Sequence, residues 1–178
     1  MRNIKKVLAE IHKRQMETFC SLEKFRDKEY PMYLLSKSRG LYWIWTNLSD
    51  MQLKKIKTGH DTKQVPISEL VSQRENLANI THEKNEQGFR IVYNGVGGGL
   101  RARILAEFTC NHPKTGTLNL SGRDGEIIFK EKNWAVSYFD FYSHSEFVKK
   151  HGISYPNDAK MLEMNWRIEY GIPILTRH

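Results

Sequence analysis

The stretch Gly40-Leu-Tyr-Trp-Ile-Trp45 is a compact run of aromatic and β-branched residues. Such residues favour strands, so we predict a core strand over residues 40–45. A second strand is predicted over 89–93 from the sequence Phe-Arg-Ile-Val-Tyr, and a β pair over 126–130 and 134–139. These strands would form one small central sheet.

Helical patterns alternate with the strands. Apolar residues recur at mostly helical spacing, and capping or breaking residues bound the segments. We predict helices over 3–26, from Ser68 to about 80, over 100–108, from Ser143 or Ser145 to about 152, and over 156–170. Residues 94–99 are predicted to form a glycine-rich turn. This order indicates an α+β domain.

Length, charge and cysteine content narrow the function classes. A chain of 178 residues is expected to form a single domain over 1–178. Lysine and arginine number 28 against 20 acidic residues, a net charge of +8, which favours a polyanionic partner such as nucleic acid or an acidic membrane surface. No apolar run approaches the ~18 residues of a membrane span. With Cys20 and Cys110 as the only cysteines, a reducing cytoplasm is expected.

Three segments carry residues suited to phosphate chemistry. They are Gly40-Leu-Tyr42, then Tyr93-Asn-Gly95 with the following Leu100-Arg-Ala-Arg103, and finally Glu163 within the last predicted helix. Glycine turns and helix starts offer free backbone N–H groups to anions, and arginine adds a bidentate phosphate donor. A carboxylate beside a phosphate is a common way to hold Mg²⁺.

The ordered set resembles the GIY-YIG nuclease family. Gly40-Leu-Tyr42 stands for GIY, and Tyr93-Asn-Gly95 stands for YIG. Family members place a leucine seven residues and an arginine ten residues after the second tyrosine, where this chain has Leu100 and Arg103. They also carry a glutamate on a late helix with a proline about ten residues on, which Glu163 and Pro173 match.

The resemblance implies a small central antiparallel β-sheet flanked by helices, with an N-terminal helical arm over 1–30 and an insertion over 46–88 between the motif strands. It also implies hydrolysis of DNA phosphodiester bonds with Mg²⁺, which Mn²⁺ could replace, held by Glu163. Arg103 would stabilise charge on the phosphate oxygens, Tyr42 would orient or deprotonate the water, and Tyr93 would support the network.

This chain departs from the family pattern at two positions. Val96 stands where many members have a lysine, and Glu107 where many have a histidine or tyrosine. The general base therefore stays open between Tyr42 and a histidine such as His112 or His144. Glu107 can also pair with Arg103 at i, i+4.

Expected DNA contacts lie around and outside these motifs. Arg101, Gly97 and Gly98 adjoin the second motif, whereas Lys54, Lys55 and Lys57 form a basic cluster in the insertion. The partner is expected to be double-stranded DNA and not a membrane. A stand-alone bacterial or phage-encoded enzyme of the restriction type is favoured, and such an enzyme would work as a homodimer on a symmetric site.

Simpler interpretations stand beside this hypothesis. Each tyrosine alone is an ordinary strand residue, and Glu163 has Arg167 at i, i+4 as a plain salt-bridge partner. The glycines at 95, 97 and 99 only faintly match a dinucleotide fingerprint, since Leu100 occupies the third glycine position. The alternative function is a non-catalytic DNA-binding module of the same fold, for which Val96 and Glu107 are the support.

Overall fold

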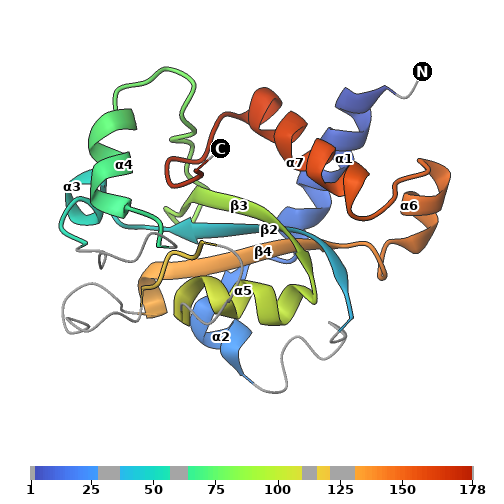
Figure 1. The fold of residues 1–178 in the computed structure, drawn as a ribbon, viewed down its shortest axis with the longest axis horizontal. Coiled ribbons are helices and arrows are strands. Elements are labelled where there is room, and N and C mark those ends of the chain that lie inside the picture. Colours follow the sequence, from blue (N-terminus) through green and yellow to red (C-terminus); the bar gives the residue numbers. More distant parts are fainter. Residues whose placement is uncertain (1–2, 28–36, 57–63, 110–115, 121–130, 178) are drawn as a thin grey trace.

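A computed structural model describes residues 3–27, 37–56, 64–109, 116–120 and 131–177 of the chain. Its described part is an α+β fold around a four-stranded antiparallel sheet with the strand order β1-β4-β2-β3 (Figure 1). The strands are β1 (Cys20–Ser21), β2 (Arg39–Thr46), β3 (Arg90–Gly98) and β4 (Trp134–Asp140). The predicted strand over 126–130 lies outside the described residues.

The central strand β2 is buried on both faces, as its aromatic sequence predicts. Alternate residues point to opposite sides of a strand. Accordingly Tyr42 and Ile44 join one hydrophobic cluster, whereas Leu41, Trp43 and Trp45 join the other. The sheet is therefore the middle layer of the fold, and side chains of β2 contribute to both cores.

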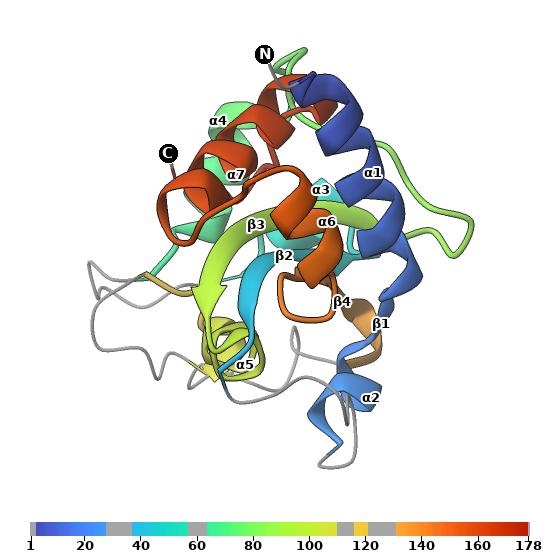
Figure 2. The same ribbon diagram turned by 90° about the vertical axis from the view of Figure 1, so that its right-hand side faces the viewer.

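Helices cover the two faces of the sheet. One core contains side chains of α1 (Ile4–Glu17) and α7 (Asn157–Tyr170), with α6 (Ser145–Lys150) beside them. The other contains side chains of α2 (Leu22–Arg26), α3 (Asp50–Leu53), α4 (Ile67–Arg74) and α5 (Leu100–Thr109). Figure 2 shows α1, α6 and α7 on one side of the strands and α2 and α5 on the other. A 3₁₀ turn, η1 (Glu131–Asn133), precedes β4.

The two motif strands are neighbours in the sheet despite the long segment between them. In the β2–β3 ladder Tyr42 is paired with Gly95, and Ile44 with Tyr93. Gly40 is required by packing, because a Cβ there would overlap the carbonyl oxygen of Phe139 on β4. The glycine-rich turn predicted over 94–99 is wrong, since β3 continues through Gly98 and only Gly99, at φ +86°, turns the chain into α5.

The described parts of the segment over 46–88 contribute to the core. Leu53 of α3 and Ile67 and Val71 of α4 are fully buried. The predicted helix from Ser68 to about 80 ends early, at Arg74. Tertiary backbone bonds explain the difference, because the amide of Thr81 donates to Ile172 O at 3.1 Å and ties this segment to the C-terminal one.

The single N-terminal helix predicted over 3–26 is also wrong. It consists of α1, the short strand β1 and α2. The break follows Thr18, whose hydroxyl accepts a 2.8 Å hydrogen bond from Tyr138 N on β4, and Cys20 then pairs with Val136. Pairing with the sheet therefore outweighs continuation of the helix.

Other predicted elements agree with the structure within a few residues. The helices expected over 100–108 and 156–170 are α5 and α7, and the latter ends at Gly171, with φ +94°. The four tryptophans are buried, as expected of core residues. No helix in the described part of the chain is long and apolar enough to cross a membrane.

Candidate active site

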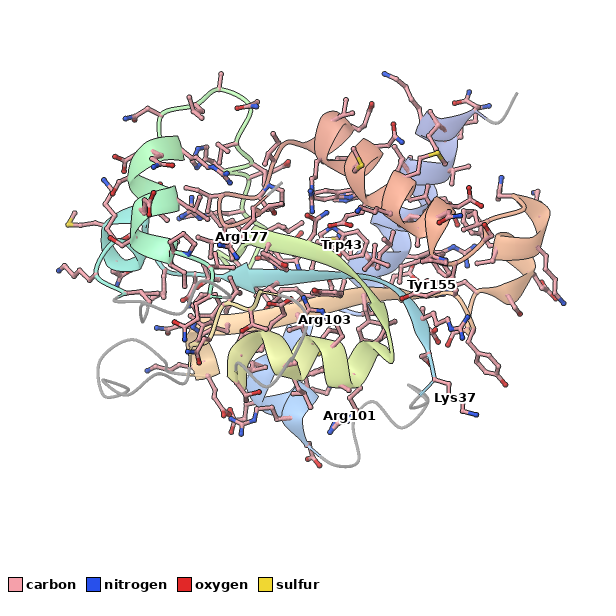
Figure 3. All side chains as sticks on the ribbon, viewed as in Figure 1. Lys37, Trp43, Arg101, Arg103, Tyr155 and Arg177 are labelled. Atoms are coloured by element: carbon pink, nitrogen blue, oxygen red, sulfur yellow. The ribbon has the colours of Figure 1, made fainter. Side chains whose placement is uncertain are left out.

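The four predicted catalytic residues line one cleft of about 1800 Å³. Tyr42 comes from β2, Tyr93 from β3, Arg103 from α5 and Glu163 from α7. Because β3 is the edge strand, helices on both sides of the sheet can reach the space beside it. Figure 3 shows Arg103 between α5 and the strands. We refer to this space, defined by these four residues, as the cleft.

Buried Glu107 joins Tyr42 to Arg103. The phenol of Tyr42 donates a hydrogen bond of 2.6 Å to Glu107 Oε1, and Arg103 Nη2 lies 2.5 Å from the same oxygen. The second oxygen, Oε2, accepts from the backbone N–H of Leu118 at 3.3 Å. Glu107 is 0% exposed and is the i, i+4 partner that the sequence predicts for Arg103.

Arg103 keeps an unused hydrogen-bonding group. Its Nη1 atom is buried and has no hydrogen-bond partner among the described residues. A buried donor without a partner is costly, so its presence needs an explanation. Because the side chain lines the cleft, a phosphate oxygen bound there would supply the missing acceptor.

Both tyrosines are held in the protonated form. Burial raises the pKa of Tyr42 well above its usual value, and the nearby carboxylate of Glu107 adds to the effect. Burial likewise raises the pKa of Tyr93. A phenol of raised pKa is a poor base at neutral pH, so these residues are better suited to donating hydrogen bonds and orienting a water than to removing its proton.

Glu163 is fixed in the cleft wall by a second ion pair. Its Oε1 atom pairs with Arg167 Nη2, one helical turn later on α7. Arg167 Nε donates to Asn94 Oδ1 at 2.9 Å, so the same guanidinium joins α7 to the edge strand. Burial raises the pKa of the Glu163 carboxyl, and the charge of Arg167 opposes this rise.

The charge of the cleft suits an anionic ligand. Among its described lining residues Glu163 is the sole carboxylate, whereas four are cationic: Arg103, Lys160, Arg167 and Arg177. The described residues hold no cluster of three or more histidine, cysteine or acidic side chains that could bind a metal. Mg²⁺ needs no such cluster, because one or two carboxylates with a substrate phosphate and waters complete its shell. Glu163 fits that small donor set.

The residues predicted to contact DNA are dispersed. Arg101 does not face the cleft. Its guanidinium donates to the carbonyls of Phe25, Arg26 and Asp27 at the end of α2. Lys54 pairs with Glu75 at 2.6 Å, and Lys55 is exposed.

The two glycines that follow the second motif are close to other side chains. A Cβ on Gly97 would lie 3.1 Å from Arg103 Cβ, and one on Gly98 would lie 2.9 Å from Tyr155 Oη.

Lys57 lies outside the described residues, as does His112. His144 is not in the cleft; its ring stacks on Phe139.

Several cleft residues were not predicted from the sequence. Two of them, Lys160 and Arg177, line the cleft, and a third, Asn94, holds Arg167 in place beside it. Only Asn94 lies within one of the sequence motifs. The position of Lys160 three residues before Glu163 was the available signal, because residues at i and i+3 share a helix face. Arg177 gave no comparable signal, since it follows the last helix.

No family model, curated protein or solved structure gives a match to this chain.

Proposed function

We propose that the protein is a divalent-metal-dependent DNA endonuclease of the GIY-YIG type, with Tyr42, Tyr93, Arg103 and Glu163 as its catalytic residues. The observation that carries this proposal is the meeting of these four side chains in one cleft. They come from four elements separated by up to 121 residues of sequence, as the positions 42 and 163 show. The residues that match the nuclease motifs in the sequence thus lie together on one concave, cationic surface.

The residues divide the chemistry between them. Arg103 Nη1 donates to a non-bridging oxygen of the scissile phosphate and stabilises the charge that develops there. Tyr42 donates its phenol proton in a hydrogen bond to Glu107 and offers its phenol oxygen as an acceptor that orients the attacking water. Tyr93 lies beside Tyr42, with ring centroids 6.3 Å apart, and supports that phenol.

Glu163 would hold the metal ion. When bound, a divalent cation stabilises the negative charge on the leaving oxygen. Arg167 keeps the Glu163 carboxylate directed along the cleft wall by pairing with one of its oxygens and anchoring on Asn94. The other carboxylate oxygen would be the ligand of the cation.

A second candidate is a DNA-binding module without catalysis. The observation in its favour is the ion pair of Arg103 with buried Glu107, which neutralises the arginine that should face the phosphate. The Nη1 atom of Arg103, which has no hydrogen-bond partner among the described residues, favours the nuclease, because Glu107 leaves this donor unused.

Replacement of Arg103 separates the two candidates. In a nuclease, R103A abolishes plasmid cleavage in Mg²⁺ while affinity for duplex DNA falls only slightly. In a binding module it weakens binding in a salt-dependent way, and the wild type never cleaves. Arg101→Ala is the matched control, because Arg101 lies on the same helix but binds the end of α2. Equal loss of cleavage in both variants would contradict the role given to Arg103.

A further inference from the structure

Three large apolar side chains stand in a row on the exposed face of α7. Met161, Met164 and Ile168 are 41%, 54% and 81% exposed. Their spacing of three and four residues places them on one helix face, along about 10 Å of the helix axis. We call these three residues the α7 stripe.

The stripe is not part of the core. The buried residues of α7 are Ala159, Leu162 and Trp166, which lie on the opposite side of the helix at 3.6 residues per turn. Single exposed apolar residues are ordinary on a protein surface. A contiguous exposed row that lines a cleft indicates a binding surface instead.

The surroundings of the stripe indicate what covers it. All three side chains line the same cleft as Arg103 and Glu163, where Lys160 and Arg177 supply further positive charge. A second copy of this chain would bring another +8 molecule against that cationic surface, which like-charge repulsion opposes. Duplex DNA is complementary, because it combines anionic phosphates with the apolar surfaces of its bases.

We propose that the α7 stripe is an apolar wedge that contacts the bases of duplex DNA bound in the cleft and locally unstacks them. Methionine and isoleucine are among the residues that proteins insert between base steps. The cations of the cleft bind the phosphate backbone of the DNA, while the stripe contacts base pairs that are easily unstacked. This inference rests on the proposed function, in that it takes duplex DNA as the ligand of the cleft.

The test compares two duplexes that carry the same charge. Wild-type protein in EDTA is titrated with a 30-base-pair homoduplex and with the same duplex carrying a central tandem mismatch. The mismatch lowers the cost of unstacking, so we expect the wild type to bind it about tenfold more tightly. The double variant M164S/I168S should lose that preference, because the wedge is gone.

Matched controls isolate the stripe. Met51→Ser replaces a methionine that is 70% exposed on α3, outside the cleft, and should keep the preference. Lys160→Ala should weaken binding to both duplexes alike and reduce the salt slope by about 1. Because the replaced side chains are exposed, all three variants should show the thermal unfolding of the wild type.

Different failures have different meanings. If the double variant keeps the preference, or the wild type shows none, the wedge is overturned while the proposed nuclease stands. If the wild type binds neither duplex at low salt, the proposed function fails and this inference with it. If the wild type sediments as a dimer without DNA and the double variant as a monomer, the stripe is a protein interface and the wedge is overturned.

Discussion

Tyr42 and Glu107 are joined by a hydrogen bond of 2.6 Å that crosses from the central strand to helix α5. The bond is fully buried, and its acceptor oxygen also pairs with Arg103. Charged groups are rarely buried this completely unless they are paired. Glu107 thereby fixes the positions of two residues that line the cleft, although it is itself buried and is not among the cleft-lining residues.

Replacing Glu107 by glutamine should destabilise the protein strongly. The amide keeps the shape of the side chain but leaves Arg103 without a buried counter-charge, which costs roughly 3 kcal/mol. Urea unfolding measures this free energy. Glu10→Gln is the control, because the Glu10–Arg14 pair is partly exposed and should contribute less than about 1 kcal/mol. Similar losses in both variants would show that the buried pair has no special importance.

Tyr42→Phe should separate positioning from packing. The ring is retained, so the core that Tyr42 joins stays filled, but the hydroxyl that donates to Glu107 is lost. We expect cleavage to slow by about 100-fold, because the hydroxyl that orients the attacking water is lost, with little change in DNA affinity. Single-turnover cleavage and a binding titration measure the two effects. Unchanged cleavage would reduce Tyr42 to a core residue.

Gly95→Ala should be far more damaging than Gly98→Ala. A Cβ on Gly95 would overlap the phenol of Tyr42, 2.6 Å from Cζ, inside the packed sheet. Overpacking of this kind typically costs about 1–3 kcal/mol. At Gly98 the nearest atom is the hydroxyl of Tyr155, which is the end of a side chain and can move. Thermal unfolding of the two variants should therefore differ, and equal melting temperatures would contradict the packing.

Glu163 should make stability fall as the pH rises. Burial raises its pKa above the ordinary value of 4.5, so the folded protein holds this proton more tightly than the unfolded chain does. The stabilisation is complete below pH 4.5 and is lost as the pH rises through the raised native pKa. The unfolding free energy of wild type minus that of Glu163→Gln should therefore decrease across that interval. An increase would mean that pairing with Arg167 outweighs burial.

The sequence predicted the elements whose pattern is local. The aromatic run of β2, the face shared by Leu100, Ile104 and Phe108 on α5, and the proline and glycine that bound α7 each depend on neighbouring residues. Predictions were wrong where distant backbone groups compete with local propensity. The helix break at Thr18 depends on Tyr138, 120 residues away, and the early end of α4 depends on the C-terminal segment.

In the candidate site, too, local patterns were predictable and long-range contacts were not. The sequence alone shows the spacing of Tyr93, Arg103 and Glu163, and it predicts the i, i+4 pairs that Arg103 and Glu163 form. The junction of Tyr42 with Glu107 is not, because it joins residues 65 positions apart through the arrangement of β2 and α5. Nor does spacing show that Arg101, two residues before Arg103, binds the end of α2.

Plasmid digestion with and without Mg²⁺ tests whether the protein is a metal-dependent nuclease that uses Glu163. Purified wild type, Glu163→Gln and the control Glu169→Gln are incubated with supercoiled DNA in Mg²⁺ or in EDTA. Glu169 lies near the C-terminal end of α7, where its carboxylate pairs with Lys5 of α1. We expect cleaved plasmid from wild type and Glu169→Gln in Mg²⁺ only, and none from Glu163→Gln. Intact plasmid in every lane, with a gel shift that weakens as salt rises, would contradict the nuclease and leave the binding module.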